Sequence, residues 1–329
     1  MSDHKKVTIV IPNYNGLDFM EPCFQALDLQ ICRDFDILVV DNGSTDGSAA
    51  WLKERGIPAI FLDSNTGFSG AVNVGIRAAA TPYVILLNND TEPDCHYVGE
   101  MIKAIELSPK IFSVSSKMVQ LYHKELMDDA GDMYCLLGWP YQRGVGRPSS
   151  GYNRPCRVFS ACAGAAIYRR DVFEEIGDFD EMHFAYLEDM DVGYRARIAG
   201  YDNIYCPSAM VYHVGSGTSG SRYNSFKVRL AARNSVYLNY KNMPALQLAV
   251  NLLPILAGTA VKYMFFKKKG FAKDYAEGLK EGLTTAHKCR KVPYRSRNLR
   301  NYLAIEWELV TGTLLYVYEF AVRQLGKLW

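Results

Sequence analysis

An aspartate that follows an apolar run has the type and place of a divalent-metal ligand. Asp90 ends the sequence Asn88-Asn89-Asp90, directly after the run YVILL. A lone carboxylate in such a place can hold Mg²⁺ or Mn²⁺ together with phosphate oxygens, because magnesium sites in proteins use few carboxylates. The alternative is a turn residue that caps the next segment, residues 91–93. Spacing alone leaves both interpretations open.

A second acidic group could accept a proton. Glu188, Asp189 and Asp191 place three charges within four residues at the expected start of a helix. Crowding and partial burial raise the proton affinity of a carboxylate, as a general base requires. Arg195, one turn beyond Asp191, can pair with it, so we interpret Asp189 as the base and Asp191 as structural. The alternative is that all three only complement the helix dipole.

His213 ends a strand-like run and precedes a glycine-rich segment, residues 215–220. A histidine between a strand and a flexible loop is well placed to bind a metal, although a lone histidine is more often structural. The glycine-rich segment could close over a bound ligand.

The elements that would position these residues alternate between strand and helix. Continuous apolar runs are typical of buried parallel strands, and helical patterns near 17–29, 47–55 and 69–80 separate them; the runs are 7–12, 36–41, 59–63 and 83–88. This order predicts a doubly wound α/β sheet. Polar clusters follow three of the strands, at 13–15, 41–44 and 88–90, so we expect one ligand crevice at their carboxyl ends.

No GxGxxG follows the first strand, and no GxxxxGK[ST] occurs. The glycines of residues 65–70 open a helix whose N-terminus could hold an anion. Farther on, we expect a strand over 111–120, a long irregular loop over 121–157, a helix from Glu188 to about Gly200, and a strand over 203–214.

Composition limits the class of protein. Hydrophobic residues make up 49% of the 329 residues and charged residues 22%, which indicates an ordered globular chain. None of the eight cysteines forms a CxxC pair, which argues against structural zinc. The start MSDHKKVTIVIP has no signal-peptide pattern, so we expect a reduced, cytoplasmic protein.

Seven segments together resemble the family-2 glycosyltransferases of the GT-A fold, and among them the bacterial rhamnosyltransferases that build cell-surface polysaccharides. The resemblance spans about residues 5–220, and its motifs are VTIVIPNYNG (7–16), LVVDNGSTDGS (38–48), NTGFSGAVNVGI (65–76), YVILLNNDT (83–91), AGAAIYRRDVFEEIGDFDE (163–181), FAYLEDMDVGYRARIAGY (184–201) and VYHVGSGTS (211–219). It implies an inverting transfer of a sugar from a nucleotide-diphosphate donor, dTDP-rhamnose first and a UDP-hexose second. The acceptor it implies is a glycan, often lipid-linked.

The resemblance also assigns roles to residues. Asp90 would bind Mn²⁺ or Mg²⁺, His213 would complete the metal site, and Asp189 would be the catalytic base. The residues assigned to the nucleotide sugar are Pro12, Asn15, Asp41, Asn65, Gly70 and Asn89, with Asp41 reading the pyrimidine. Asn88 departs from the pattern, because many relatives carry Asp there, and this leaves the metal preference open.

The chain divides in charge near residue 240. Residues 1–240 carry 22 basic and 29 acidic side chains, whereas residues 241–329 carry 15 and 6. We expect a catalytic domain over 1–240, with a nucleotide-binding half (1–120) and an acceptor half (121–240), and a basic helical region over 241–329.

Within that region, 22 apolar-rich residues (245–266) carry one stripe of Gln247, Asn251, Pro254, Gly258 and Lys262. Basic runs follow at 267–269 and 287–300. We expect either an interfacial helix on the cytoplasmic face of the membrane or a helical dimerisation domain. A membrane-spanning helix ranks third, since the polar stripe would be costly in lipid.

Two other functions are weighed against the sugar transferase. A sugar-nucleotide nucleotidyltransferase would need a basic glycine-rich loop after the first strand, and PNYNG has no Lys or Arg. A nucleic-acid-binding protein is disfavoured by the acidic body and by the lack of aromatic residues among the basic ones.

Overall fold

The N-terminal part of the chain folds as the alternating pattern predicts. The computed structural model describes residues 5–215 and 223–325 of the protein. Its first elements are β1 (Val7–Asn13), α1 (Leu17–Asp28), β2 (Phe35–Asp41), α2 (Ser48–Glu54), β3 (Ala59–Phe61), α3 (Gly67–Ala78) and β4 (Tyr83–Leu87). The four strands are parallel in the order β4-β1-β2-β3, and β1 and β4 are buried along almost their whole length, which explains their continuous apolar sequences.

The second part of the chain extends the same sheet beyond β4. Strand β11 (Ala165–Arg169) pairs antiparallel with β4, and β6 (Ile111–Gln120), β12 (Asp202–His213) and β10 (Cys156–Val158) follow in that order. Two strands lie off this path: β5 (Thr91–Pro93) pairs with β12, and β7 (His123–Asp129) pairs with β6. The expected strands over 111–120 and 203–214 are therefore present.

The prediction of an irregular loop over 121–157 is wrong. The segment contains β7, a hairpin of β8 (Asp132–Tyr134) and β9 (Pro140–Gln142), a short 3₁₀ turn (Ser149–Gly151) and β10. Gly131 and Gly138 have positive φ values of 93° and 69°, so these glycines form the sharp bends that separate strands. Met127, Ala130 and Tyr134 are fully buried and anchor the segment to the rest of the molecule.

Helices cover both faces of the sheet and enclose two apolar cores. One core joins the sheet to α1 and to α4 (Tyr97–Glu106) through side chains such as Met20, Leu27 and Met101. The other joins it to α3, to α5 (Val172–Ile176) and to α6 (Glu188–Ala199), with Val72 and Val192 as members. The result is the three-layer GT-A architecture that the sequence predicts.

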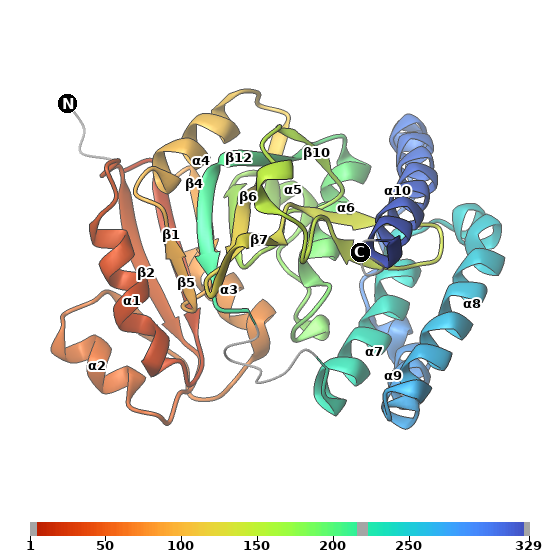
Figure 1. The fold of residues 1–329 in the computed structure, drawn as a ribbon, viewed down its shortest axis with the longest axis horizontal. Coiled ribbons are helices and arrows are strands. Elements are labelled where there is room, and N and C mark those ends of the chain that lie inside the picture. Colours follow the sequence, from red (N-terminus) through yellow and green to blue (C-terminus); the bar gives the residue numbers. More distant parts are fainter. Residues whose placement is uncertain (1–4, 216–222, 326–329) are drawn as a thin grey trace.

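Four further helices, α7 (Ser225–Asn242), α8 (Ala245–Lys268), α9 (Ala272–Thr285) and α10 (Leu299–Leu325), form the end of the molecule opposite α1 and α2 (Figure 1). They pack on α6 and on the β8–β9 hairpin through a third core that includes Tyr134, Tyr194, Leu238 and Leu309. The expected boundary at residue 240 falls inside α7.

The polar stripe of α8 faces the protein. Gln247 and Asn251 both donate to Glu306 of α10, at 2.9 and 3.0 Å, and the Lys262 ammonium lies over the Trp139 ring at 5.4 Å. Gly258 packs so closely that an added Cβ would lie 2.3 Å from the Leu137 carbonyl oxygen. Many apolar side chains of α8, such as Leu246, Leu253 and Val261, point outward, whereas Leu248 and Ile255 join the third core. By length and composition this helix could cross a membrane, and 11% of its most apolar stretch is buried in the protein.

Candidate active site

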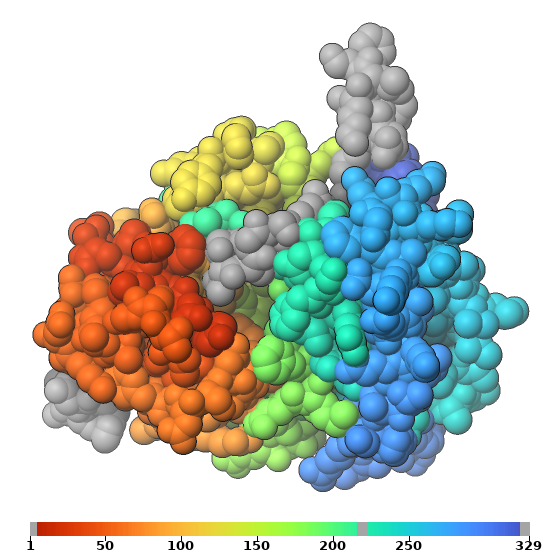
Figure 2. All heavy atoms as spheres, turned by 90° about the horizontal axis from the view of Figure 1, so that it is seen from below, coloured from red at the N-terminus to blue at the C-terminus, as the bar shows by residue number. Residues whose placement is uncertain are grey.

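A cleft of roughly 790 Å³ opens at the carboxyl ends of the strands, where the polar clusters were expected. It receives side chains from both halves of the sheet and from α7. Figure 2 shows the molecule from below, with the N-terminal half on the left and α7 to the right of it. Among the predicted residues, the cleft is lined by Pro12, Asn65, Asn89, Asp90, Asp189 and His213. Most of the glycine-rich segment proposed to close over a ligand lies outside the described residues.

A network of amides builds the end of the cleft next to β1 and β2. Asn13 donates to Asp41 at 2.8 Å and accepts from Asn89 at 2.6 Å. Asn42 donates to Asn65 at 3.0 Å. Each amide is therefore held in one orientation before any ligand arrives, which favours recognition of a polar group such as a base or ribose.

Three residues assigned to the nucleotide sugar do not line this cleft. Asp41 is buried behind Asn13, and Asn15 is exposed and accepts a hydrogen bond from the Thr45 amide at 2.8 Å. Gly70 lies inside α3, where its missing Cβ makes room for Thr66. In this structure they position neighbouring groups, and Asn13, which sequence reasoning did not assign, is one of the cleft residues.

Asp90 and His213 meet at the rim of the sheet, as predicted. Strand β5 pairs antiparallel with β12 so that Thr91 lies opposite His213, and this register sets the preceding Asp90 beside the imidazole. The His213 Nε2 atom lies 3.3 Å from Asp90 Oδ1, and Nδ1 is hydrogen-bonded to Asp128 at 2.7 Å. Burial lowers the pKa of His213, but the interactions with the carboxylates of Asp128 and Asp90 outweigh burial and raise it to about 10.

These groups fit a divalent cation. The Oδ1 atom of Asp90 is buried, and its 3.3 Å contact with His213 Nε2 lacks hydrogen-bond geometry, so a cation could take the place of the imidazole proton between them. An oxygen from Asp90 and a nitrogen from His213 suit Mn²⁺ or Mg²⁺ when diphosphate oxygens complete the shell. Asp128 would orient the imidazole from behind. It lies in the segment predicted as irregular, which is why sequence reasoning missed it.

Asp189 lies at the N-terminus of α6 and reaches the same cleft. Its carboxylate accepts from the Met190 amide at 2.7 Å and from the Ala163 amide at 3.3 Å. Burial raises the pKa of Asp189. The hydrogen bonds from these amides lower the pKa by less, so it lies above its ordinary value. The carboxylate is thus held in place, and its raised proton affinity suits a general base.

Asp191 plays the structural role predicted for it. It is fully buried and accepts from Arg195 at 2.9 Å, as expected one turn away, and from Lys241 and Asn242 of α7 at 2.8 Å each. Burial alone would raise the pKa of this carboxyl, but Lys241 and Arg195 hold it well below its usual range.

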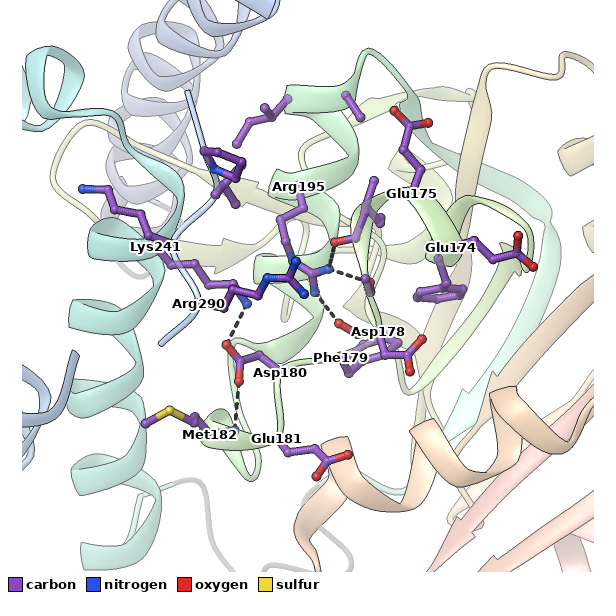
Figure 3. A pocket seen from close by; sticks show the side chains of 18 of the residues that line it. Glu174, Glu175, Asp178, Phe179, Asp180, Glu181, Met182, Arg195, Lys241 and Arg290 are labelled. Atoms are coloured by element: carbon purple, nitrogen blue, oxygen red, sulfur yellow. Dashed lines mark hydrogen bonds and ion pairs between the residues drawn. The ribbon is translucent and has the colours of Figure 1, made fainter. Parts of the chain in front are cut away.

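A second cleft, of roughly 720 Å³, lies on the other side of these ion pairs (Figure 3). There Arg195 donates to the main-chain oxygens of Ile176, Gly177 and Asp178 at 2.6 to 2.7 Å, and Lys241 binds Asp180 at 2.7 Å. These two cations fasten α6 to the segment before it and to α7.

The backbone that leads into α6 is strained. Phe184, Tyr186 and Leu187 all have positive φ, between 63° and 70°, which side-chain-bearing residues adopt only when their surroundings hold them. Asn234 of α7 does this: its buried amide donates to the carbonyl oxygens of His183, Ala185 and Tyr186 at 2.7 to 2.9 Å. The position of Asp189 therefore depends on α7.

Comparison with known proteins agrees with this geometry. The profile of glycosyl transferase family 2 matches residues 8–177. The N-acetylglucosaminyl-diphospho-decaprenol L-rhamnosyltransferase of Mycobacterium tuberculosis is 28% identical over 241 residues, which cover 64% of this chain and 77% of that protein.

Two solved structures share the fold. S. aureus TarS 1–349 in complex with UDP-GlcNAc aligns with a TM-score of 0.58 at 16% identity, over 85% of this chain and 81% of that one. GalNAc-T7 with UDP, GalNAc and Mn²⁺ aligns with a TM-score of 0.59 at 15% identity, over 73% of this chain and 48% of that one.

Proposed function

This chain belongs to glycosyl transferase family 2, and from that premise we propose that it transfers L-rhamnose from dTDP-rhamnose to a hydroxyl group of a lipid-linked glycan, with inversion at the anomeric carbon. The observation that carries the proposal is the convergence of Asp90, His213 and Asp189 on one cleft. The choice of sugar and of a lipid-linked acceptor is supported by the name of the mycobacterial relative. A UDP-hexose donor is the alternative.

Asp90 and His213 would hold Mn²⁺ or Mg²⁺, and a bound cation supplies positive charge that neutralises the leaving diphosphate. Asp189 is placed to accept the proton of the acceptor hydroxyl. As its oxygen bonds to the anomeric carbon, the bond from that carbon to the diphosphate breaks and the proton passes to the Asp189 carboxylate. The two hydrogen-bonded amides keep this carboxylate aimed at the cleft.

Two substitutions separate the roles of the carboxylates. Asp189→Asn should lower turnover by about a thousandfold or more while leaving metal-dependent donor binding intact. Asp90→Ala should abolish metal-dependent binding itself. Thermal shift with dTDP-rhamnose and UDP-sugars, with and without Mn²⁺, measures donor binding, since a ligand that binds the native state raises the unfolding temperature.

Asp178→Asn is the matched control, because Asp178 forms a salt bridge with Arg77 at 2.7 Å outside the cleft. Undiminished turnover in Asp189→Asn would reject the base assignment. If UDP-sugars raised the unfolding temperature and dTDP-rhamnose did not, the donor would be a UDP-hexose.

We also propose that the enzyme binds the cytoplasmic face of the membrane through its C-terminal helices. Their outer side chains form an apolar surface that has no cover in the described part of the chain, made by Leu246, Val250, Leu253, Leu256, Val261 and Met264 of α8 and by Leu303, Trp307, Leu314 and Tyr318 of α10. Groups of exposed apolar side chains such as these can mark interaction sites. Basic residues at 267–269 and 288–300 lie next to this surface in sequence. A second copy of the chain would bring the same positive charge, so anionic lipid headgroups are the favoured partner.

Vesicle co-sedimentation tests this surface. The full-length protein should sediment with phosphatidylglycerol vesicles more than with phosphatidylcholine vesicles, and the double substitution Leu253→Glu with Trp307→Glu should abolish binding. Leu107→Glu is a matched control, because Leu107, directly after the last residue of α4, is as exposed as Leu253. A dimer in sedimentation velocity that the double substitution dissociates, without vesicle binding, would assign the surface to dimerisation instead.

A further inference from the structure

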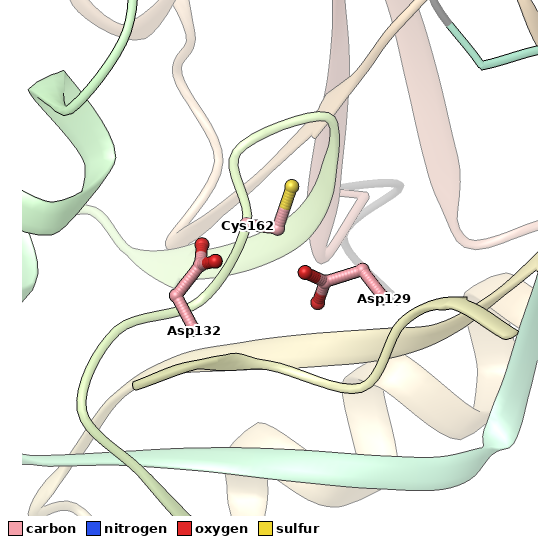
Figure 4. A group of neighbouring side chains, drawn as sticks. All are labelled: Asp129, Asp132 and Cys162. Carbon is pink, nitrogen blue, oxygen red and sulfur yellow. The ribbon is translucent and has the colours of Figure 1, made fainter. Parts of the chain in front are cut away.

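A carboxylate beside the catalytic base has no partner in the part of the protein that the structure describes. Asp132 begins the β8–β9 hairpin and lies close to Asp129 and Cys162; one ligand atom from each of the three lies within 4.8 Å of the others (Figure 4). The Asp132 side chain is 8% exposed and lines the cleft. Buried carboxylates are rarely left without hydrogen bonds, so this one calls for a ligand.

The backbone of Asp132 is held by three hydrogen bonds, in contrast to its side chain. Its amide donates to the Ser160 carbonyl oxygen at 3.0 Å, and its own carbonyl oxygen accepts from the amides of Phe159 and Ser160 at 3.0 and 3.1 Å. The Ser160 hydroxyl in turn donates to the carbonyl oxygen of Asp189 at 2.6 Å. One short segment therefore fixes Asp132 relative to the catalytic base, a construction that suits a binding residue.

Only one carboxylate of this group reaches the cleft. Asp129 is fully buried, accepts from the Gly131 amide at 2.5 Å, and is not among the cleft-lining residues. Beside Asp132 the cleft is lined by Gln142 and Pro140 of the hairpin and by Cys162. A cation held here without diphosphate oxygens would need further carboxylates that face the cleft, whereas one carboxyl group next to an amide suits the hydroxyl groups of a neutral sugar.

We propose that Asp132, with Gln142, binds hydroxyl groups of the acceptor sugar and presents the attacking hydroxyl to Asp189. The inference rests on the proposed glycosyl transfer and adds the acceptor subsite to it. The amide network proposed to bind the sugar nucleotide comes from residues before 90. The β8–β9 hairpin lines a different wall of the cleft, which this network does not use.

The test separates acceptor binding from donor chemistry. Burial and the neighbouring Asp129 raise the pKa of Asp132, so its carboxyl group can donate a hydrogen bond as well as accept one. In Asp132→Asn the KM for the acceptor should rise about tenfold, because an amide does not reproduce the hydrogen bond of that hydroxyl. Donor hydrolysis by water and Mn²⁺-dependent donor binding should stay at the wild-type level. The acceptor probe is an N-acetylglucosaminyl diphosphate with a short prenyl chain, the class named for the mycobacterial relative. Asp132→Glu, which keeps the carboxyl group, should recover part of the affinity.

The outcomes are distinct. A wild-type enzyme that neither transfers to this probe nor hydrolyses the donor would overturn the proposed function and this inference with it. A wild-type enzyme that does transfer, with an unchanged acceptor KM in both variants, would overturn the acceptor subsite alone. Calorimetry that counts two Mn²⁺ ions in the wild type and one in Asp132→Asn would replace the sugar subsite by a second cation site.

Discussion

The substitution Asn234→Ala tests whether α7 holds the catalytic base Asp189 in position. The Asn234 side chain is fully buried and donates to three carbonyl oxygens of the strained segment 183–187. The amide has two hydrogens, so the three contacts amount to about two hydrogen bonds of about 1 kcal/mol each, and their loss removes this donor from the carbonyl oxygens of Ala185 and Tyr186. Asn234→Ala should therefore lower the free energy of unfolding by about 2 kcal/mol, and relaxation of the positive-φ residues should move Asp189.

The catalytic consequence follows from that movement. A shift of about 1 Å in a reacting group costs on the order of a hundredfold in rate, so kcat should fall by about ten- to a hundredfold. Urea unfolding gives the stability change, and initial rates of nucleotide release at 20 °C, well below the unfolding transition, give kcat. Mn²⁺-dependent donor binding, which does not use Asp189, should weaken much less than kcat falls.

Asn301→Ala is the matched control for this experiment. Asn301 of α10 also uses its amide to hold α6, but with one bond, to the Ile198 carbonyl oxygen at 2.9 Å and at the other end of the helix. Its loss should cost about 1 kcal/mol and leave kcat within about twofold. Equal kcat in the two variants, despite the larger stability loss of Asn234→Ala, would refute the dependence of Asp189 on α7.

Three further results are expected. Lys241→Met should lower the free energy of unfolding by about 3 to 5 kcal/mol in urea titrations, because it leaves the buried Asp191 without one of its cations. Gly67→Ala should weaken donor binding about tenfold or more in calorimetry, since φ is +78° there and the new Cβ would lie 2.4 Å from the Phe184 carbonyl oxygen. His183 is buried, which lowers its pKa to about 4 against 6.5 unfolded, so the unfolded chain binds the extra proton. Stability should fall by about 2 kcal/mol from pH 7 to pH 5 through this group, and His183→Phe should lose that part of the pH dependence.

The sequence predicted the parts of the site that lie at the ends of regular elements. Asp90 follows a buried strand whose apolar run is continuous, and His213 ends a strand-like run. Asp189 lies at a helix start, and it could be separated from Asp191 because Asp191 has Arg195 as its i,i+4 partner. The parallel order of β1 to β4 follows from the alternation of strand and helix, because right-handed crossovers leave few other arrangements.

The parts that were missed depend on pairing between distant segments. Asp128 and Asp132 lie in residues 121–157, whose glycines and prolines hide a strand and a hairpin, and only tertiary contacts reveal that they reach the cleft. The stripe on α8 was visible from its spacing, but spacing cannot say which side of a helix the protein covers. The burial of Asp41 behind Asn13 is likewise a matter of packing.

The short pairing of β5 with β12 has a consequence for synthesis of the chain. Thr91 and His213, which this pairing joins, are separated by 122 positions along the chain, the difference of their numbers. Closing so long a loop carries an entropic cost and is typically a late event in folding. A nascent chain can assemble the amide network of β1, β2 and β4 soon after those strands emerge, whereas His213 becomes available only once β12 has been made. A ribosome-arrested chain that ends before β12 should therefore lack affinity for the divalent ion.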